Sequence, residues 1–128
     1  IASLDYLNIN DNFKFYSKNG STEINIKPKK IFNTLSKLPI GEIILNSIDR
    51  DGTSNGFDFS ILKQIPKNFP KPIIYSGGAG NHQHLIDALK KKKIDSISTA
   101  NLLNFVGDGL QEARKQIIKK KIKLAKWI

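Results

Sequence analysis

Short apolar runs and longer amphipathic segments alternate along this chain of 128 residues. Four of the runs are too short for helices and rich in β-branched residues, which predicts buried strands. These runs are Ile1–Leu4, Ile43–Leu45, Pro72–Tyr75 and Ile94–Ser98. Apolar residues at helical spacing, with Pro28, Asp58 and Asn81 suited to helix starts, predict the helices that follow. They are expected at Pro28–Leu38, Phe59–Gln64, His82–Lys92 and from Leu110 to about Lys121.

A β-hairpin is predicted between the first strand and the first helix. Asn12–Ser17 alternates in polarity and Lys18-Asn19-Gly20 is a turn signal, so the hairpin is expected over Phe13–Ile26. Four successive strand-helix units predict a parallel sheet with helices outside it.

The number of units bears on the architecture. A closed (β/α)8 barrel, the TIM barrel, has eight units, whereas this chain has four and also lacks Met. We therefore interpret residues 1–128 as one domain, a (β/α)4 half of such a barrel. An open four-stranded doubly wound sheet is the competing architecture.

Composition narrows the class of protein. The chain has no Cys, which excludes disulfides and thiolate chemistry, and no apolar run long enough to span a membrane, so we expect a cytoplasmic protein. The net charge is +10, but all basic residues except Arg50 and Arg114 are Lys. Nucleic-acid readers favour Arg. The runs Lys90–Lys93 and Lys119–Lys121 stand at predicted helix ends, which favours solvated helix termini over a nucleic-acid surface.

Polar residues follow each of the four predicted strands. Asp5 follows the first, Asn46–Asp51 the second, Ser76–Gly80 the third and Thr99–Asn101 the fourth. Ligands of parallel α/β proteins bind at the carboxyl ends of the strands. The pattern therefore predicts a site at this end of the sheet.

The loop SIDRDGTSNGFD, Ser47–Asp58, carries more charge than a turn needs. Asp51-Gly52 points into this loop and could hold substrate hydroxyls. Asp49 could instead pair with Arg50 or with a backbone amide.

The turn SGGAGN, Ser76–Asn81, leads from a strand into a helix. Its glycines let backbone N–H groups approach an anion at a helix start, so phosphate binding is favoured over a plain tight turn. Ala100-Asn101 would complete such a pocket if the fourth loop closes on the same point.

Asp5 and the two histidines are the remaining candidates for chemistry. Partial desolvation of a carboxylate suits acid or base work, so Asp5 is a candidate catalytic residue, and a helix cap or salt bridge is an equally good reading of the same residue. His82 and His84 stand two residues apart in one helical turn and do not share a face. Neither a metal site nor a cofactor is predicted.

The strings GEIILNSIDRDGTSNGFD, IIYSGGAGN and Ala-Asn-Leu-Leu-Asn-Phe carry a specific resemblance. In this order and spacing they resemble the C-terminal half of the HisF family, the cyclase subunits of imidazole glycerol phosphate synthase, over essentially the whole chain. The resemblance implies an eight-fold barrel that takes ammonia from a glutaminase (HisH-like) subunit docked at its bottom face. The ammonia reacts with a bisphosphate at the top, and the products are imidazole glycerol phosphate and an aminoimidazole carboxamide ribotide.

The resemblance also assigns roles to residues. Asp5 matches the catalytic aspartate of the C-terminal half, while the second aspartate would lie on the absent N-terminal half. The phosphate-binding backbone groups match Gly77, Gly78, Ala100 and Asn101. The substrate-contacting positions match Asn46, Asp51, Gly52 and Ser76. Asp49 and Arg50 are expected to brace the loop.

Two departures from the family pattern bear on the substrate. Asn46 stands where the histidine-pathway enzymes usually have Thr, and Asn101 where they usually have Ser. A sister branch, encoded with surface-polysaccharide genes, supplies ammonia for amidination of a nucleotide sugar, and LNSIDRDG resembles that branch as well. Two further functions stay open from the sequence, namely a basic nucleic-acid module and a silent half-barrel that only assembles.

Overall fold

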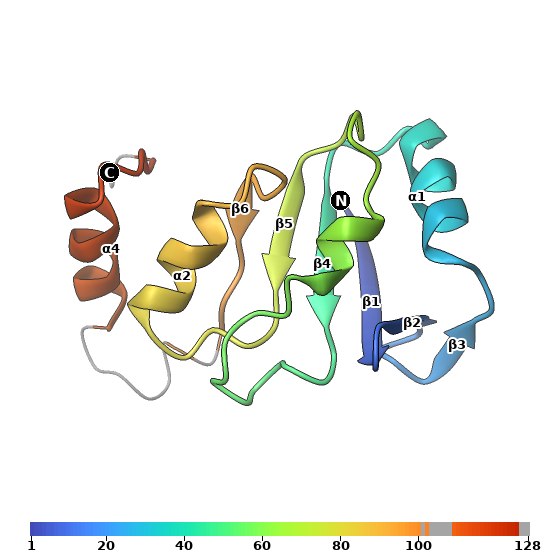
Figure 1. Ribbon diagram of the computed structural model, residues 1–128, viewed down its shortest axis with the longest axis horizontal. Coiled ribbons are helices and arrows are strands. Elements are labelled where there is room, and N and C mark those ends of the chain that lie inside the picture. Colours follow the sequence, from blue (N-terminus) through green and yellow to red (C-terminus); the bar gives the residue numbers. More distant parts are fainter. Residues whose placement is uncertain (101, 103–108, 126–128) are drawn as a thin grey trace.

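A parallel sheet with an antiparallel extension forms the centre of the computed structural model, which describes residues 1–100, 102 and 109–125. The described residues contain a six-stranded sheet in the order β3-β2-β1-β4-β5-β6 (Figure 1). Four of the strands, β1, β4, β5 and β6, pair in this order and run parallel to one another. The prediction of a parallel sheet built from four strand-helix units is confirmed.

The strands lie where they were predicted, and they differ from the prediction mainly in the residues at which they begin and end. They are β1 (Ala2–Ile9), β2 (Asn12–Ser17), β3 (Thr22–Ile24), β4 (Ile43–Ser47), β5 (Ile73–Ser76) and β6 (Ser96–Ile97). Strand β6 is much shorter than the predicted Ile94–Ser98. The hairpin is confirmed, because β2 and β3 pair antiparallel and Lys18, Asn19 and Gly20 in their turn have φ angles of 53°, 57° and 79°.

The helices follow the strands as predicted, with one difference in type. They are α1 (Pro28–Lys37), the 3₁₀-helix η1 (Ser60–Gln64), α2 (His82–Leu89) and α4 (Gly109–Lys119). Pro28 begins α1, and Asn81 caps α2 by accepting a hydrogen bond from the backbone N of His84 at 3.0 Å. The segment predicted as a helix at Phe59–Gln64 forms only η1, in which each hydrogen bond closes a tighter turn.

The first strand is longer than its apolar run predicts. The run ends at Leu4, and Asp5 was expected to follow the strand, but β1 continues to Ile9. That expectation was wrong because residues 5–9 pair antiparallel with β2. Asn10 and Asp11 have positive φ angles of 52° and 62°, as the two central residues of a tight hairpin turn require. The parallel pairing of β1 with β4 ends one residue after Asp5.

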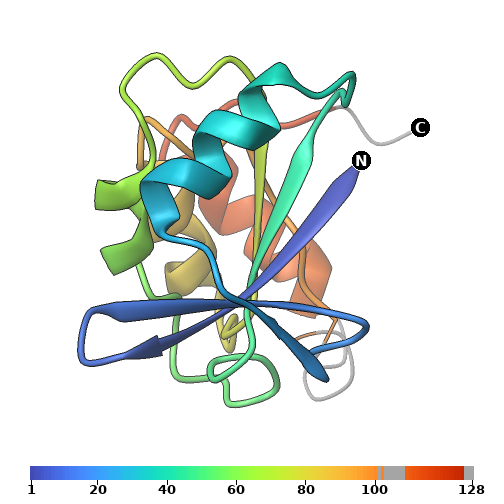
Figure 2. The ribbon, with the colours of Figure 1, turned by 90° about the vertical axis from the view of Figure 1, so that its right-hand side faces the viewer.

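Helices cover one face of the parallel strands. In Figure 2, α1, η1 and α2 lie on the same side of β1, β4 and β5. Alternate residues of these strands are buried on that side, and the residues between them are half-buried or exposed. A doubly wound sheet carries helices on both faces, whereas a barrel carries them only outside. The structure is therefore part of a (β/α)8 barrel, and the barrel is not closed.

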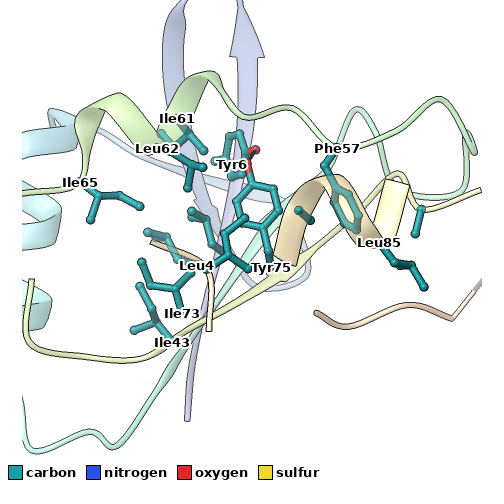
Figure 3. Packing of buried hydrophobic residues seen from close by; sticks show 14 of the residues in the cluster. Leu4, Tyr6, Ile43, Phe57, Ile61, Leu62, Ile65, Ile73, Tyr75 and Leu85 are labelled. Atoms are coloured by element: carbon teal, nitrogen blue, oxygen red, sulfur yellow. Dashed lines mark hydrogen bonds between the residues drawn. The ribbon is translucent and has the colours of Figure 1, made fainter. Parts of the chain in front are cut away.

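The hydrophobic core fills the space between the sheet and the helices. Strand residues such as Leu4, Ile43 and Ile73 meet Ile61 and Leu62 of η1 in this layer (Figure 3). Burying each large apolar side chain contributes ~1.5–3 kcal/mol to folding. The core therefore fixes the strands whose carboxyl ends carry the polar residues.

The two lysine runs lie at helix ends, as predicted. Lys90–Lys93 follows α2, and Lys119–Lys121 closes α4. Lys93 donates hydrogen bonds to the carbonyl oxygens of Leu62 and Ile65, at 2.8 and 2.5 Å. Among the residues that the structure describes, no helix is long and apolar enough to span a bilayer.

Two buried tyrosines hold the start of η1 to the sheet. The hydroxyl oxygens of Tyr6 and Tyr75 lie 2.8 Å apart, and both hydroxyls contact the carbonyl oxygen of Asp58. Figure 3 shows the two side chains next to each other inside the core. Burial raises the pKa of Tyr6 to about 12, and it also raises the pKa of Tyr75. The core therefore favours the neutral, hydrogen-bonding form of both side chains.

We expect the free energy of unfolding to fall as the pH rises from 10 to about 12. The unfolded chain loses its tyrosine protons near the ordinary pKa of 10.0, whereas Tyr6 in the folded chain keeps its proton to about pH 12. The contribution of Tyr6 is therefore complete below pH 10 and is lost as the pH rises, by about 1.4 kcal/mol per pH unit. Urea unfolding followed by circular dichroism between pH 9 and 12 measures this slope.

The matched variants are Tyr6→Phe and Tyr16→Phe, because Tyr16 is a half-buried tyrosine of the hairpin. Lysine titration contributes to the slope in both variants, so only their difference reports Tyr6. We expect a shallower slope in Tyr6→Phe alone. Equal slopes in the two variants would contradict this account of Tyr6.

Candidate functional site

Three of the predicted site residues form one row across the sheet. Asp5 of β1 pairs in register with Asn46 of β4, and Asn46 pairs with Ser76 of β5. All three side chains are half-buried and lie on the face that the helices do not cover, because their neighbours along each strand point into the core. Asn46 Nδ2 donates to Asp5 Oδ1 at 3.3 Å, which joins two members of the row directly.

The loop Ser47–Asp58 holds its shape mainly through hydrogen bonds within itself. The buried Ser47 hydroxyl donates to Asp49 Oδ1 at 2.8 Å, and the Ser47 carbonyl accepts from the backbone N of Asp51 at 3.0 Å. Thr53 donates to the carbonyl of Arg50 through its hydroxyl at 2.8 Å. Asp49 therefore braces the loop through Ser47, and Asp51 is left exposed.

The far end of this loop is fixed by Asp58. Its Oδ2 accepts from Asn8 Nδ2 at 2.8 Å, and its Oδ1 accepts from the backbone N of Ser60 at 2.9 Å, as a helix-capping side chain does. Burial alone would raise the pKa of Asp58, but the hydrogen bonds from Ser60 and Asn8 and the charge of Arg50 outweigh it and lower this pKa. Phe59, rather than Asp58, occupies the formal N-cap position of η1.

The glycine-rich turn after β5 packs directly against this loop. The backbone N of Gly56 donates to the carbonyl of Gly78 at 2.8 Å. A Cβ atom at Gly78 would overlap the Gly56 carbonyl, and one at Gly80 would overlap Ser54. Gly78 also has a φ of +107°, which disfavours any other residue. The backbone contact with the loop thus explains part of the glycine content that the sequence suggested was for a phosphate.

A small cavity opens beside this turn. Its volume is about 90 Å³. Polar and small residues from three loops line it, namely Asp51, Gly52, Ser76, Gly77, Gly78, Ala79, Ser98, Thr99 and Ala100. Gly77 and Gly78 both have positive φ angles in its wall. Backbone groups in such turns form concave sites for anions.

The structure brings most of the predicted site residues to one end of the sheet. Asp51, Gly52, Ser76, Gly77, Gly78 and Ala100 line the cavity. Asp5 and Asn46 stand beside it in the row that ends at Ser76. Asn101, which was predicted to bind phosphate, lies outside the described residues.

Two hydroxyl-bearing residues of the cavity had no individual role in the prediction, although Thr99 belongs to the polar segment Thr99–Asn101 that was expected at the site. Ser98 was placed in the fourth strand and Thr99 at its end, but both line the cavity because β6 already stops at Ile97. The polarity of the segment after Ile97 was the signal that could have identified them.

His84 serves a local role in α2. Its Nδ1 accepts a hydrogen bond from the backbone N of Gly80 at 3.1 Å, which ties the turn to the helix. The described residues contain no group of His, Cys, Asp or Glu suited to hold a metal ion.

Comparison with known proteins identifies the family of this chain. The family described as histidine biosynthesis protein matches residues 1–107. A relative from Parasynechococcus marenigrum, provisionally named imidazole glycerol phosphate synthase subunit hisF2, is 41% identical over 99% of this chain and 48% of its own length. The subunit HisF of imidazole glycerol phosphate synthase from Chloroherpeton thalassium is 32% identical over 89% of this chain and 45% of its own.

A third relative is similar over most of this chain. The subunit HisF from Methanococcus maripaludis is 36% identical over 86% of this chain and 40% of its own length. The chain thus spans about half the length of the curated relatives it matches. On the match over residues 1–107 and the partial barrel that the described residues form, the chain belongs to the histidine biosynthesis protein family and is HisF-like.

Proposed function

We propose that this chain is the carboxyl-terminal half of a cytoplasmic, HisF-type cyclase. The complete barrel would use ammonia from a glutaminase partner to convert a phosphorylated substrate into imidazole glycerol phosphate and an aminoimidazole carboxamide ribotide. The observation that carries the proposal is the row Asp5, Asn46 and Ser76, which leads across the open sheet face to the glycine-walled cavity. A carboxylate thus stands beside the cavity that we propose for an anion.

Asp5 is the proposed catalytic residue of this half. It lies on a rigid strand whose position is set on both sides, by β4 and by β2, so its carboxylate is held at a defined place. A carboxylate beside a bound substrate can accept or donate a proton during ring closure. The second catalytic aspartate is expected on the amino-terminal half-barrel, so we expect the isolated chain to be nearly inactive.

The substrate phosphate is proposed to bind in the cavity. Gly77, Gly78 and Ala100 line this cavity, and no large side chain is among its lining residues, so we propose that their backbone N–H groups hold the phosphate. Asp51, Gly52 and Ser76 line the same cavity, and their position supports contacts with the rest of the substrate. Anion binding by backbone amides needs no particular side chain.

The names of the relatives bear on the choice of substrate. The three relatives described above are all named as imidazole glycerol phosphate synthase subunits. This supports the histidine-pathway substrate over the nucleotide sugar. The same names support a glutaminase partner, and the half-length match to each relative supports an amino-terminal half-barrel.

We expect Asp5→Asn to lower ammonia-dependent turnover of the bisphosphate strongly, to a small residual rate, in this chain joined with its amino-terminal half. The amide keeps the shape of the side chain but cannot exchange the proton, and removal of an acid-base group costs roughly 10²–10⁴-fold in rate. Product formation is followed spectroscopically under saturating ammonia. Asp87→Asn is the control, because Asp87 lies on α2 and its carboxylate accepts a hydrogen bond from the exposed Gln83 side chain, away from the row of site residues.

Turnover by Asp5→Asn at the wild-type rate would contradict the catalytic role of Asp5. Absence of turnover in a well-folded wild-type barrel would contradict the histidine-pathway assignment. The nucleotide-sugar reaction would then be the next to test.

We expect Gly78→Ala to weaken binding of inorganic phosphate by about tenfold or more, because the new Cβ displaces the backbone amides of the cavity. Phosphate binding is measured from the amide resonances of Gly77, Gly78 and Ala100 in a ¹⁵N NMR titration. The matched control is Gly41→Ala, since a Cβ at Gly41 meets nothing within 4 Å. Undiminished affinity in a folded Gly78→Ala protein would overturn the phosphate assignment.

A further inference from the structure

Asp5 receives its hydrogen bonds on one of its two oxygens. Asn46 Nδ2 donates to Oδ1 over 3.3 Å, and Ser3 Oγ donates to the same atom over 3.4 Å. Within the described part of the chain, Oδ2 of Asp5 accepts no hydrogen bond. Oδ1 is therefore occupied by two hydrogen bonds, and Oδ2 remains available to exchange a proton with the substrate.

The contact with Asp5 also fixes which way the Asn46 amide points. A carboxylate only accepts hydrogen bonds when it is ionised, so the NH₂ group of Asn46 must face Asp5. Its carbonyl Oδ1 then faces the other side, 3.3 Å from the place that a Cβ of Gly77 would occupy. Asn46 thus spans the gap between the carboxylate and the glycine turn in one orientation.

The chemistry of an amide suits such a role. Its N–H groups donate hydrogen bonds but are not acidic enough to give up the proton in the pH range where carboxylates titrate. Asn46 can therefore orient Asp5 without competing for the proton that Asp5 transfers. A distance of 3.3 Å is at the long end of the range for such bonds, and bonds of this kind shorten when substrate completes a site.

We propose that Asn46 is a positioning residue for Asp5, which holds Oδ2 toward the reacting atoms, rather than a direct ligand of the substrate. This inference rests on the proposed function, because it requires Asp5 to transfer a proton. It differs from the role that the resemblance assigned to Asn46, which was contact with the substrate. The donor amide of Asn46 stands where the resemblance expects a Thr hydroxyl.

The kinetic test replaces Asn46 with Leu, which is similar in size but donates no hydrogen bond. In the complete barrel with saturating ammonia, we expect kcat to fall by about 10–100-fold, because misplacement of a catalytic group by ~1 Å has an effect of this size. KM for the bisphosphate is expected to change by less than about threefold. Asn33→Leu on α1 makes the same chemical change at an exposed position and serves as the control.

The double variant Asp5→Asn with Asn46→Leu tests whether Asn46 affects the rate through Asp5. If Asn46 acts through Asp5, Asn46→Leu should lower the residual rate of Asp5→Asn by less than about twofold. A loss in the double variant equal to the product of the two single losses would overturn the proposal. A tenfold rise in KM with unchanged kcat would overturn it too, since it would make Asn46 a substrate ligand.

An NMR measurement tests the pair without turnover, so failure of the proposed function cannot be mistaken for failure of this inference. The side-chain ¹⁵N–¹H resonances of Asn46, assigned by their absence in Asn46→Leu, are followed through an acid titration of the chain. We expect one titration step in the wild type and loss of that step in Asp5→Asn. The same step in both proteins would show that the Asn46 amide does not sense Asp5, and would overturn the inference.

Discussion

The parallel register of β1, β4 and β5 is the constraint on which the rest of the structure depends. It places Asp5, Asn46 and Ser76 side by side on the open face. The same alternation turns Tyr6 and Tyr75 toward the helices, where their hydroxyls hold the start of η1. A slip of one residue in β1 would exchange its two faces, burying the Asp5 carboxylate and exposing Tyr6. The same backbone hydrogen bonds therefore place the site residues on one face of the sheet and the core residues on the other.

The loop Ser47–Asp58 and the glycine turn depend on each other. Gly56 and Gly78 are joined by a backbone hydrogen bond, and no side chain fits between the two segments. The loop is in turn fixed at its ends by Ser47 and Asp58. Glycine at these positions therefore serves close packing as well as the proposed access for an anion. The two explanations do not compete, because amides can line a cavity only where the backbone itself forms the wall.

Local signals in the sequence predicted the elements well, and long-range contacts account for what was missed. Pro28 and Asn81 mark helix starts through their own chemistry, so no distant residue is needed to place them. The extension of β1 to Ile9 depends on pairing with β2, so the apolar run at the start of β1 does not predict it. Likewise, the packing of Gly80 against Ser54 joins segments far apart in the sequence. The row of three site residues was foreseeable only as separate strand ends, because the sequence of a single strand does not determine its register with its neighbours.

The hairpin divides the outer edge of β1 into two parts. Strand β2 occupies this edge from Asp5 onward, while Ala2–Leu4 pair with β4 on one side and, in the described residues, with no strand on the other. A further strand that joins β1 can bind only along these first residues and must stop before Asp5. The hairpin thus limits the registers in which a further strand can pair with β1. It also gives the backbone of Asp5 one fixed partner on this edge, which is β2.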